Sequence, residues 1–365
     1  MASFEFLSPS GSNLTNGVIA ATNCMKLKVT RNTAPWIYSN YPEAIGRGGK
    51  GKAIADPDAK GNKYFINQQK VSGSGEVFFS HTNYTGKTLK IRVHIFNPNS
   101  STVTVKRTNM GMSSGYNNAA DTVINYFNSA TKQFTLAKNG SAWLTDECAV
   151  PNGQPASGMI RFESDKVIIV TVYAYLNLSS VDGTETTYPY GFEWCDDKTQ
   201  GSTKYPPVYT GLGNGNFITF AHGTIKVSDL LKKPYIYASN GDNYSHPNDN
   251  EIVPIKLLGT NLTASLTAAH DDLKNLGNWC THTSNTITFK NDTTSAKTIY
   301  GSLCGNSAGN TQVINYKGKM HSKVLHEETW RWAKITLQAG ETYALDFQHI
   351  IASYGAPATI HQWKV

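Results

Sequence analysis

The sequence predicts an all-β protein: two tandem antiparallel β-sandwich domains, Ig-like or jelly-roll-like, related by internal duplication, with one or two short helices. Three observations carry this prediction. Many short segments are rich in Val, Ile, Thr, Tyr and Phe and are separated by turn residues such as Asn-Pro and Asn-Gly. Charged residues make up only 16% of the 365 residues, which is well under the usual quarter. Finally, two segments of the strand pattern recur in the same order in both halves.

The first recurring segment is LKIRVHIFNPNSSTVTVKRTNMGMSSG at residues 89–115. From Val93 onward it aligns without a gap with ITFKNDTTSAKTIYGSLCGNSAG at residues 287–309, so that Asn97 falls on Asn291. The second is FTLAKNGSAWL at residues 134–144, which corresponds to ITLQAGETYAL at residues 335–345. Two segments in the same order, at similar separations, indicate a duplicated β-sandwich.

Residue composition and strand pattern divide the chain into four parts. A polar, Gly/Ser-rich N-terminal segment covers residues 1–23, and the first sandwich domain covers residues 24–180. A connecting segment with a few short strands follows at residues 181–250, and the second sandwich domain covers residues 251–365.

Within the N-terminal segment, Phe4 and Phe6 alternate with polar residues and Leu7 follows them. Such an alternating stub is an edge strand of its own domain or a donor strand that inserts into a neighbouring subunit. Because the second alternative implies self-assembly, these three residues are the candidate assembly site.

Local patterns place the remaining elements in order. Residues 39–75 contain many Gly, Pro, Lys and Asn residues and predict loops. Apolar residues on one face predict a helix over residues 117–129, and Ser228 is the expected cap of a short helical turn at residues 228–232. Asn139-Gly140 is a strong hairpin signal. Strands are predicted at residues 25–29, 77–79, 89–96, 102–107, 133–136, 141–144, 158–162, 166–176, 216–221, 234–238, 285–290, 296–302, 331–337 and 341–349.

Composition limits the partners and the cell compartment. The net charge of +7 is spread along the chain, apart from RGGKGK at residues 47–52, so we expect no nucleic-acid partner. No apolar run approaches the length needed to span a membrane. The first residues do not form a signal peptide. We expect a mature extracellular or cell-surface protein, with an intracellular protein as the alternative. The five cysteines show neither CxxC nor zinc spacing.

The pattern G-x-S-x-G occurs twice, around Ser113 and around Ser307. In α/β-hydrolases it forms a nucleophile elbow between a strand and a helix. Here the two copies occupy equivalent places in the two halves, and a repeated structural turn explains that placement better than two nucleophiles. Adjacent acidic pairs point to opposite faces of a strand, and the ten histidines show no ligand spacing. The sequence therefore predicts a protein that is not an enzyme and requires no cofactor.

Calcium is the one ion for which the sequence offers candidate ligands. The polar loop at residues 239–251 carries several side-chain oxygens close together. The candidate ligands there are Asp242, Asn243, Asp249, Asn250 and Glu251. A second loop at residues 56–62 begins like a calcium loop but lacks the downstream Glu.

Aromatic residues supply candidates for a carbohydrate site. Trp330 and Trp332 alternate and should share one face of a strand, while Tyr188, Tyr190 and Trp194 crowd one loop. Exposed, such residues would stack on sugar rings; buried, they belong to a core.

The leading functional expectation is a non-enzymatic extracellular structural or cell-surface protein that self-assembles into oligomers or filaments by strand exchange. Its partner is then another copy of itself. The alternative is a carbohydrate-binding or adhesive module whose partner is an extracellular polysaccharide. A hydrolase or a secreted toxin ranks below both.

Overall fold

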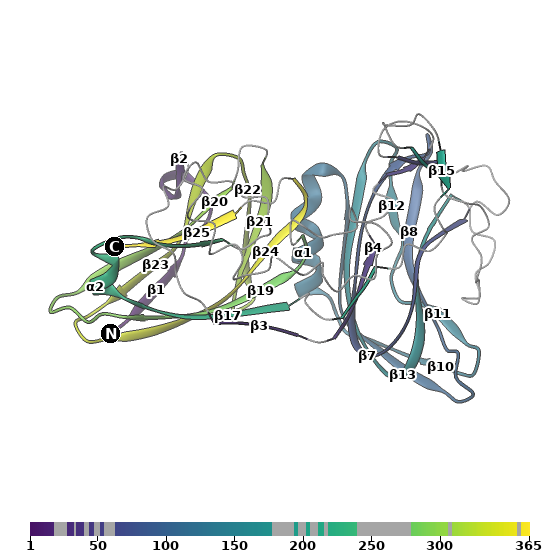
Figure 1. Cartoon of the computed structure of the whole chain (residues 1–365), viewed down its shortest axis with the longest axis horizontal. Helices are drawn as coiled ribbons and strands as arrows, with labels where there is room; N and C mark the ends of the chain where they lie inside the picture. Colours follow the sequence, from purple (N-terminus) through teal and green to yellow (C-terminus); the bar gives the residue numbers. More distant parts are fainter. Residues whose placement is uncertain are drawn as a thin grey trace. The chain divides into compact units, whose positions relative to one another are not determined.

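The computed structural model describes residues 1–17, 28–32, 34–39, 44–46, 52–54, 63–176, 193–195, 202–204, 211–214, 218–238, 279–305, 309–355 and 359–365. Most of these residues lie in strands, which confirms the all-β prediction (Figure 1). The described residues divide into two compact units. Unit 1 takes its residues from the ranges 1–32, 216–264 and 274–365, and unit 2 from the range 33–215.

Unit 1 contains two six-stranded sheets. The first runs in the order β1-β23-β20-β25-β18 with β2 also beside β23, and the second runs β22-β21-β24-β19-β17-β3. The elements of this unit are β1 (Ser3–Phe6), β2 (Leu14–Asn16), β3 (Lys28–Arg31), β17 (Ile218–Lys226), α2 (Val227–Leu230), β18 (Tyr235–Ala238), β19 (His282–Lys290), β20 (Lys297–Gly305), β21 (Asn310–Tyr316), β22 (Lys319–Leu325), β23 (Glu328–Leu337), β24 (Thr342–Gly355) and β25 (Thr359–Lys364).

One apolar core lies between these two sheets. It takes Trp330, Trp332 and Trp363 from the first sheet and Phe289 and Phe347 from the second, all of them buried. The Trp332 ring lies 4.5 Å from the Phe347 ring and 5.6 Å from the Trp363 ring, measured between centroids. Large aromatic side chains therefore fill the space between the sheets.

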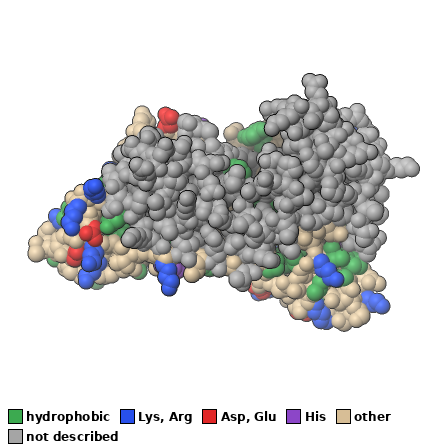
Figure 2. Space-filling model, in the orientation of Figure 1, with side chains coloured by type: hydrophobic (Ala, Val, Ile, Leu, Met, Phe, Trp, Pro, Cys, Tyr) green, Lys and Arg blue, Asp and Glu red, His purple; other side chains and the backbone are tan. Residues whose placement is uncertain are grey.

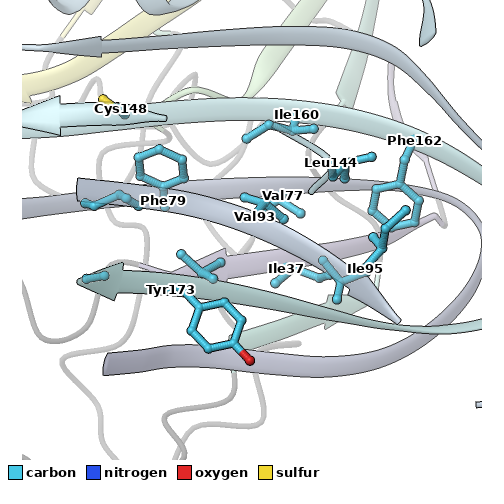
Figure 3. Close-up of a cluster of buried hydrophobic side chains, with 14 of the residues drawn as sticks. Ile37, Val77, Phe79, Val93, Ile95, Leu144, Cys148, Ile160, Phe162 and Tyr173 are labelled. Atoms are coloured by element: carbon cyan, nitrogen blue, oxygen red, sulfur yellow. The ribbon is translucent and has the colours of Figure 1, made fainter. Parts of the chain in front are cut away.

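Unit 2 is organised around two long antiparallel strands that pair along most of their length, β7 (Lys63–Tyr84) and β13 (Pro155–Tyr175). The other strands of its sheet are β4 (Pro35–Ser39), β5 (Ala44–Gly46), β6 (Lys52–Ile54), β8 (Leu89–Phe96), β9 (Val103–Ser114), β10 (Lys132–Leu136), β11 (Ser141–Trp143), β12 (Cys148–Val150), β14 (Glu193–Cys195), β15 (Ser202–Lys204) and β16 (Gly211–Asn214). Side chains from both halves of β13 enter one core, which Figure 3 shows with Ile160 and Phe162 from one half and Tyr173 from the other.

The helix predicted at residues 117–129 is confirmed as α1 (Ala119–Asn128), which packs on β9 of the same unit. The shorter helical turn is α2, but its predicted cap is wrong. The Ser228 hydroxyl donates to Asp292 Oδ2 at 2.6 Å instead of to the helix backbone.

Several predicted connections are also wrong. Strands were expected at residues 158–162 and 166–176 with a turn between them, yet β13 is one strand that only shifts register between Ser164 and Ile168. Residues 63–75, expected to be loop, belong to β7. Asn139-Gly140 forms a turn but no hairpin, because β10 before it pairs with β9 and β11 after it pairs with β8.

A buried asparagine stands at the corner between β8 and β9. The Asn97 amide nitrogen donates to the carbonyl oxygens of Ser101, Leu136 and Ala137 at 2.8–3.0 Å, and its Oδ1 accepts from the Asn99 backbone N–H at 2.9 Å. Since β8 and β9 do not pair with each other, this corner is not a hairpin. The side chain thereby ties the corner after β8 to the end of β10.

The corner between β19 and β20 has the same arrangement. The Asn291 amide nitrogen donates to the carbonyl oxygens of Ser295, Leu337 and Gln338 at 2.9–3.0 Å, and Oδ1 accepts from the Thr293 backbone N–H at 3.1 Å. Here the corner carries the chain from one sheet of unit 1 to the other.

No helix among the described residues is long and apolar enough to cross a membrane. On the face drawn in Figure 2, the Lys and Arg side chains of the described residues lie as separate spots. Of the basic stretch at residues 47–52, only the backbone of Lys52, in β6, belongs to the described part.

Candidate functional site

The candidate assembly segment is the outermost strand of its sheet. β1 pairs antiparallel with β23, with Phe4 opposite Ile335 and Phe6 opposite Ala333. The strand is short, and its side chains alternate between exposed and half-buried. In this chain, therefore, the segment occupies the edge position of unit 1, the first of the two alternatives predicted from its pattern.

The two Phe side chains of β1 point toward the other sheet of unit 1. The Phe4 ring lies 4.4 Å from the Tyr316 ring and 6.2 Å from the Tyr343 ring, between centroids. Phe6 lies 4.4 Å from His321 and 6.2 Å from the core residue Trp332. β1 thus covers one open side of the core between the sheets.

Polar contacts hold the same segment in register. The Leu7 N–H donates to the Trp332 carbonyl at 2.9 Å, and the indole Nε1–H of Trp330 donates to the Leu7 carbonyl at 3.3 Å. Glu5 Oε1 lies 2.7 Å from Lys334 Nζ on the exposed side of the strand. The hydrogen bond from Lys334 to Glu5 raises the pKa of Lys334.

The candidate carbohydrate residues Trp330 and Trp332 lie in the core and have no exposed surface. They share one face of β23, as the alternation predicts, but that face is the interior one, so neither ring is available to stack on a sugar. Trp194 lies in β14, with its side chain outside the described part, and Tyr188 and Tyr190 are outside it as well.

The predicted calcium ligands Asp242, Asn243, Asp249, Asn250 and Glu251 lie outside the described residues, as does the loop at residues 56–62. In the part of the chain that is described, no group of three or more His, Cys, Asp or Glu side chains is placed to hold a metal ion.

Ser113, the first candidate nucleophile, lies within β9 and is tied to α1. Its hydroxyl lies 2.5 Å from the Thr122 hydroxyl, which in turn lies 2.8 Å from the Ser157 hydroxyl. The nearby Cys148 thiol contacts the Ser113 carbonyl, and burial raises the pKa of this thiol to about 11, so it is protonated at neutral pH. The hydroxyl groups of Ser113, Thr122 and Ser157 join the helix to the sheet. Ser307 lies outside the described residues.

A buried histidine pair bridges the two sheets of unit 1. The distance from Nδ1 of His349, in β24, to Nε2 of His361, in β25, is 3.1 Å, and both side chains are almost fully buried. His349 Nε2 is 2.6 Å from Gln312 Oε1, and the Gln312 amide nitrogen donates to Asn310 Oδ1. Because Gln312 Oε1 can only accept, His349 donates to it through Nε2 and accepts from His361 at Nδ1.

This histidine pair was not predicted, because the two residues carry no motif and come from different sheets. Burial lowers the pKa of His349 to about 3, and burial followed by the neighbouring His349 lowers the pKa of His361 well below its ordinary value. Both rings are therefore neutral at physiological pH, and the network is a structural link between the sheets.

We expect unit 1 to lose stability as the pH falls from 6.5 toward 3. In this window the unfolded chain protonates His349, whose ordinary pKa is 6.5, whereas the folded chain does not. The unfolded state then binds more protons, so the free energy of unfolding falls by about 1.4 kcal/mol per pH unit. Urea unfolding at pH 7 and pH 5 measures this loss. A His349→Gln variant should show a smaller loss, and His222→Gln, at an exposed histidine, should match the parent. An unchanged pH dependence in His349→Gln would contradict the assignment.

No protein-family model matches the chain, and it has no match among curated proteins. Solved structures match with low similarity. GK1651 from Geobacillus kaustophilus is 7% identical, with 99% of this chain and 96% of that chain covered, at a TM-score of 0.14. The mannose 6-phosphate isomerase from Bacillus subtilis is 11% identical, with 82% and 75% covered, at a TM-score of 0.14. Protein Ylba from E. coli is 10% identical, with 85% and 86% covered, at a TM-score of 0.12. At these scores the likenesses carry no inference about this chain.

Proposed function

We propose that this chain is a non-enzymatic structural protein of the cell surface or extracellular space, and that it self-assembles when β1 of one copy replaces β1 of another. The observation that carries the proposal is the position of β1: a short N-terminal edge strand whose Phe4 and Phe6 cover the core between the two sheets. A second copy offers the same acceptor surface, so exchange creates no new kind of contact.

The balance of free energies supports exchange. A half-buried Phe contributes about 1 kcal/mol and each backbone hydrogen bond about 1 kcal/mol. Ordering each of the four residues of β1 costs about 1–2 kcal/mol. These contributions nearly cancel, so the strand is held by a small net free energy and can leave its own unit.

The modules of such an assembly would be two β-sandwiches that arose by duplication. The two asparagine corners support this view, since Asn97 and Asn291 bond equivalent carbonyls. Strand pairing around them also corresponds. β8 pairs with β11 and β9 with β10 around the first corner, and β19 pairs with β24 and β20 with β23 around the second.

Cysteine cross-linking between copies tests the exchange. Glu5 and Lys334 are direct partners across β1 and β23, which is a spacing that a disulfide can bridge. When the single variants Glu5→Cys and Lys334→Cys are mixed, refolded together and oxidised, we expect disulfide-linked dimers whose yield rises with protein concentration, because the cross-link requires β1 of one copy beside β23 of the other. Non-reducing gel electrophoresis measures the yield.

The matched control uses a pair inside unit 2. Lys106 and Gln133 are exposed partners across β9 and β10, and mixing Lys106→Cys with Gln133→Cys should give only background dimers. The proposal fails if the Glu5 and Lys334 mixture gives no more dimer than this control at any concentration while the double variant closes fully as a monomer.

Two further expectations rest on side chains outside the described part. A polysaccharide partner would be contacted through Tyr188, Tyr190 and Trp194, and calcium would be held by the loop at residues 239–251. Both stay predictions, and the assembly proposal depends on neither.

A further inference from the structure

A hollow of about 360 Å³ opens in unit 2 beside the C-terminal end of α1. This volume is within the range of roughly 300–1,000 Å³ that small-molecule sites occupy. The lining side chains that matter here are Arg107, Met110, Met112, Asn125, Asn128 and Asp146. Two of them carry opposite full charges, and two are apolar thioethers.

Arg107 provides a buried positive charge. Its side chain is only 8% exposed, and Nη1 donates to the Leu144 carbonyl at 2.9 Å and contacts Met110 Sδ at 3.1 Å. Nε is enclosed and has no hydrogen-bond partner among the described residues, whereas Nη2, which also has none there, is not enclosed. Nη2 is therefore the nitrogen of Arg107 that can donate to an added anion, and an ionised acceptor such as a carboxylate makes the strong, charge-assisted form of that hydrogen bond.

Negative charge lies at the rim of the same hollow. Burial lowers the pKa of Arg107, and the negative charge of the exposed Asp146 side chain partly opposes this effect. Among the described contacts, however, Asp146 forms no ion pair with Arg107. The last turn of α1, with Asn125 and Asn128, also ends at the hollow, and the carbonyl groups at a helix C-terminus carry partial negative charge.

We propose that this hollow binds a free α-amino acid with an apolar side chain. The carboxylate accepts from Nη2 of Arg107, and the ammonium group lies against Asp146 and the C-terminal end of α1. The side chain packs on Met110 and Met112, whose flexible thioethers adapt to apolar ligands.

Other ligand classes fit the charges less well. A carboxylate without an ammonium group meets the Arg107 guanidinium but is repelled by Asp146. A neutral sugar leaves both charges without a counterpart. The site lies in unit 2 and uses no residue of β1, so it is independent of the assembly proposal.

Calorimetric titration of the intact chain tests the site with a matched set of probes. The set comprises L-leucine, 4-methylpentanoate, which lacks the ammonium group, 3-methylbutylamine, which lacks the carboxylate, and methyl α-glucoside. We expect L-leucine to bind at least about tenfold more tightly than either analogue, because each charged contact contributes a charge-assisted hydrogen bond. Methyl α-glucoside should not bind.

A substitution of Asp146 tests whether the rim of the hollow contributes to binding. Asp146→Asn, at an exposed position that should not disturb folding, is expected to weaken L-leucine binding about tenfold while 4-methylpentanoate binds as well as before or better. Asp121→Asn, in the first turn of the same helix, removes the same charge at the other end and should leave L-leucine binding unchanged. The proposal is overturned by no L-leucine binding, by equal binding of 4-methylpentanoate, by binding of the glucoside, or by unchanged affinity in Asp146→Asn.

Discussion

Replacing Asn291 with alanine is expected to lower the free energy of unfolding of unit 1 by about 3–4 kcal/mol. The variant loses the hydrogen bonds that the amide donates to the carbonyl oxygens of Ser295, Leu337 and Gln338. The Ser295 and Gln338 carbonyls keep a second donor, the Thr293 hydroxyl and the Glu341 N–H, whereas the Leu337 carbonyl loses its side-chain donor. The Asn291 side chain is fully buried, so water cannot replace the amide without entering the corner between the sheets. Urea unfolding followed by tryptophan fluorescence measures the loss, because the core of unit 1 contains three buried Trp residues, Trp330, Trp332 and Trp363.

Two further variants make this prediction specific. Asn291→Asp should be at least as damaging, since a carboxylate cannot donate to carbonyl groups. Asn152→Ala makes the same chemical change at an exposed position with one hydrogen bond, to the Gly86 N–H, and should cost less than about 1 kcal/mol. An Asn291→Ala variant as stable as Asn152→Ala would show that the corner does not depend on the amide.

The repeated sequence pattern located the two corners but not their geometry. Asn97 and Asn291 aligned because a short turn segment requires an amide at that position, which is a local requirement. The pattern did not show which strands pair across each corner, because pairing is decided by contacts far along the chain. A third corner went unnoticed. The buried Asn83 amide nitrogen donates to the Lys87 and Val150 carbonyls at 2.7 Å, and its Oδ1 accepts from the Thr85 N–H at 2.9 Å.

The candidate sites show the same division between local and distant information. Alternation correctly placed Trp330 and Trp332 on one face, but only the second sheet decides that this face is interior. His349 and His361 lie in strands of different sheets. Arg107 and Asp146 line the same hollow, although α1, β10 and β11 separate them in the sequence. None of these groupings has a spacing in sequence that would reveal it.

The contact between α1 and the sheet of unit 2 is close at Gly111. A Cβ added there would lie 1.8 Å from the Thr122 carbonyl oxygen and 2.4 Å from the Tyr126 nitrogen, both in the helix backbone. A backbone cannot move aside as the end of a side chain does, so the whole helix must shift. The same interface holds the hydrogen bond from the Tyr126 hydroxyl to the buried Glu76 carboxylate, at 2.7 Å, and a shift would break it.

We therefore expect Gly111→Ala to destabilise unit 2 by about 3 kcal/mol or more, at or beyond the usual upper limit for overpacking. Loss of the helix contact should also raise amide hydrogen exchange across residues 119–128 well above that of β7, because the helix would separate from the sheet before the strands unfold. Hydrogen exchange read by mass spectrometry distinguishes this local loss from general destabilisation.

The control for Gly111→Ala is Gly73→Ala in β7 of the same unit. An added Cβ there meets nothing within 4 Å, and only the positive φ of 76° opposes the substitution, at about 1–2 kcal/mol. If Gly111→Ala costs no more than Gly73→Ala and leaves exchange in α1 unchanged, the helix does not rest on this glycine. If the loss of protection from exchange is large and confined to α1, the first G-x-S-x-G pattern is a packing site for the helix. Gly111 then provides the close approach, and Ser113 provides a hydroxyl to Thr122.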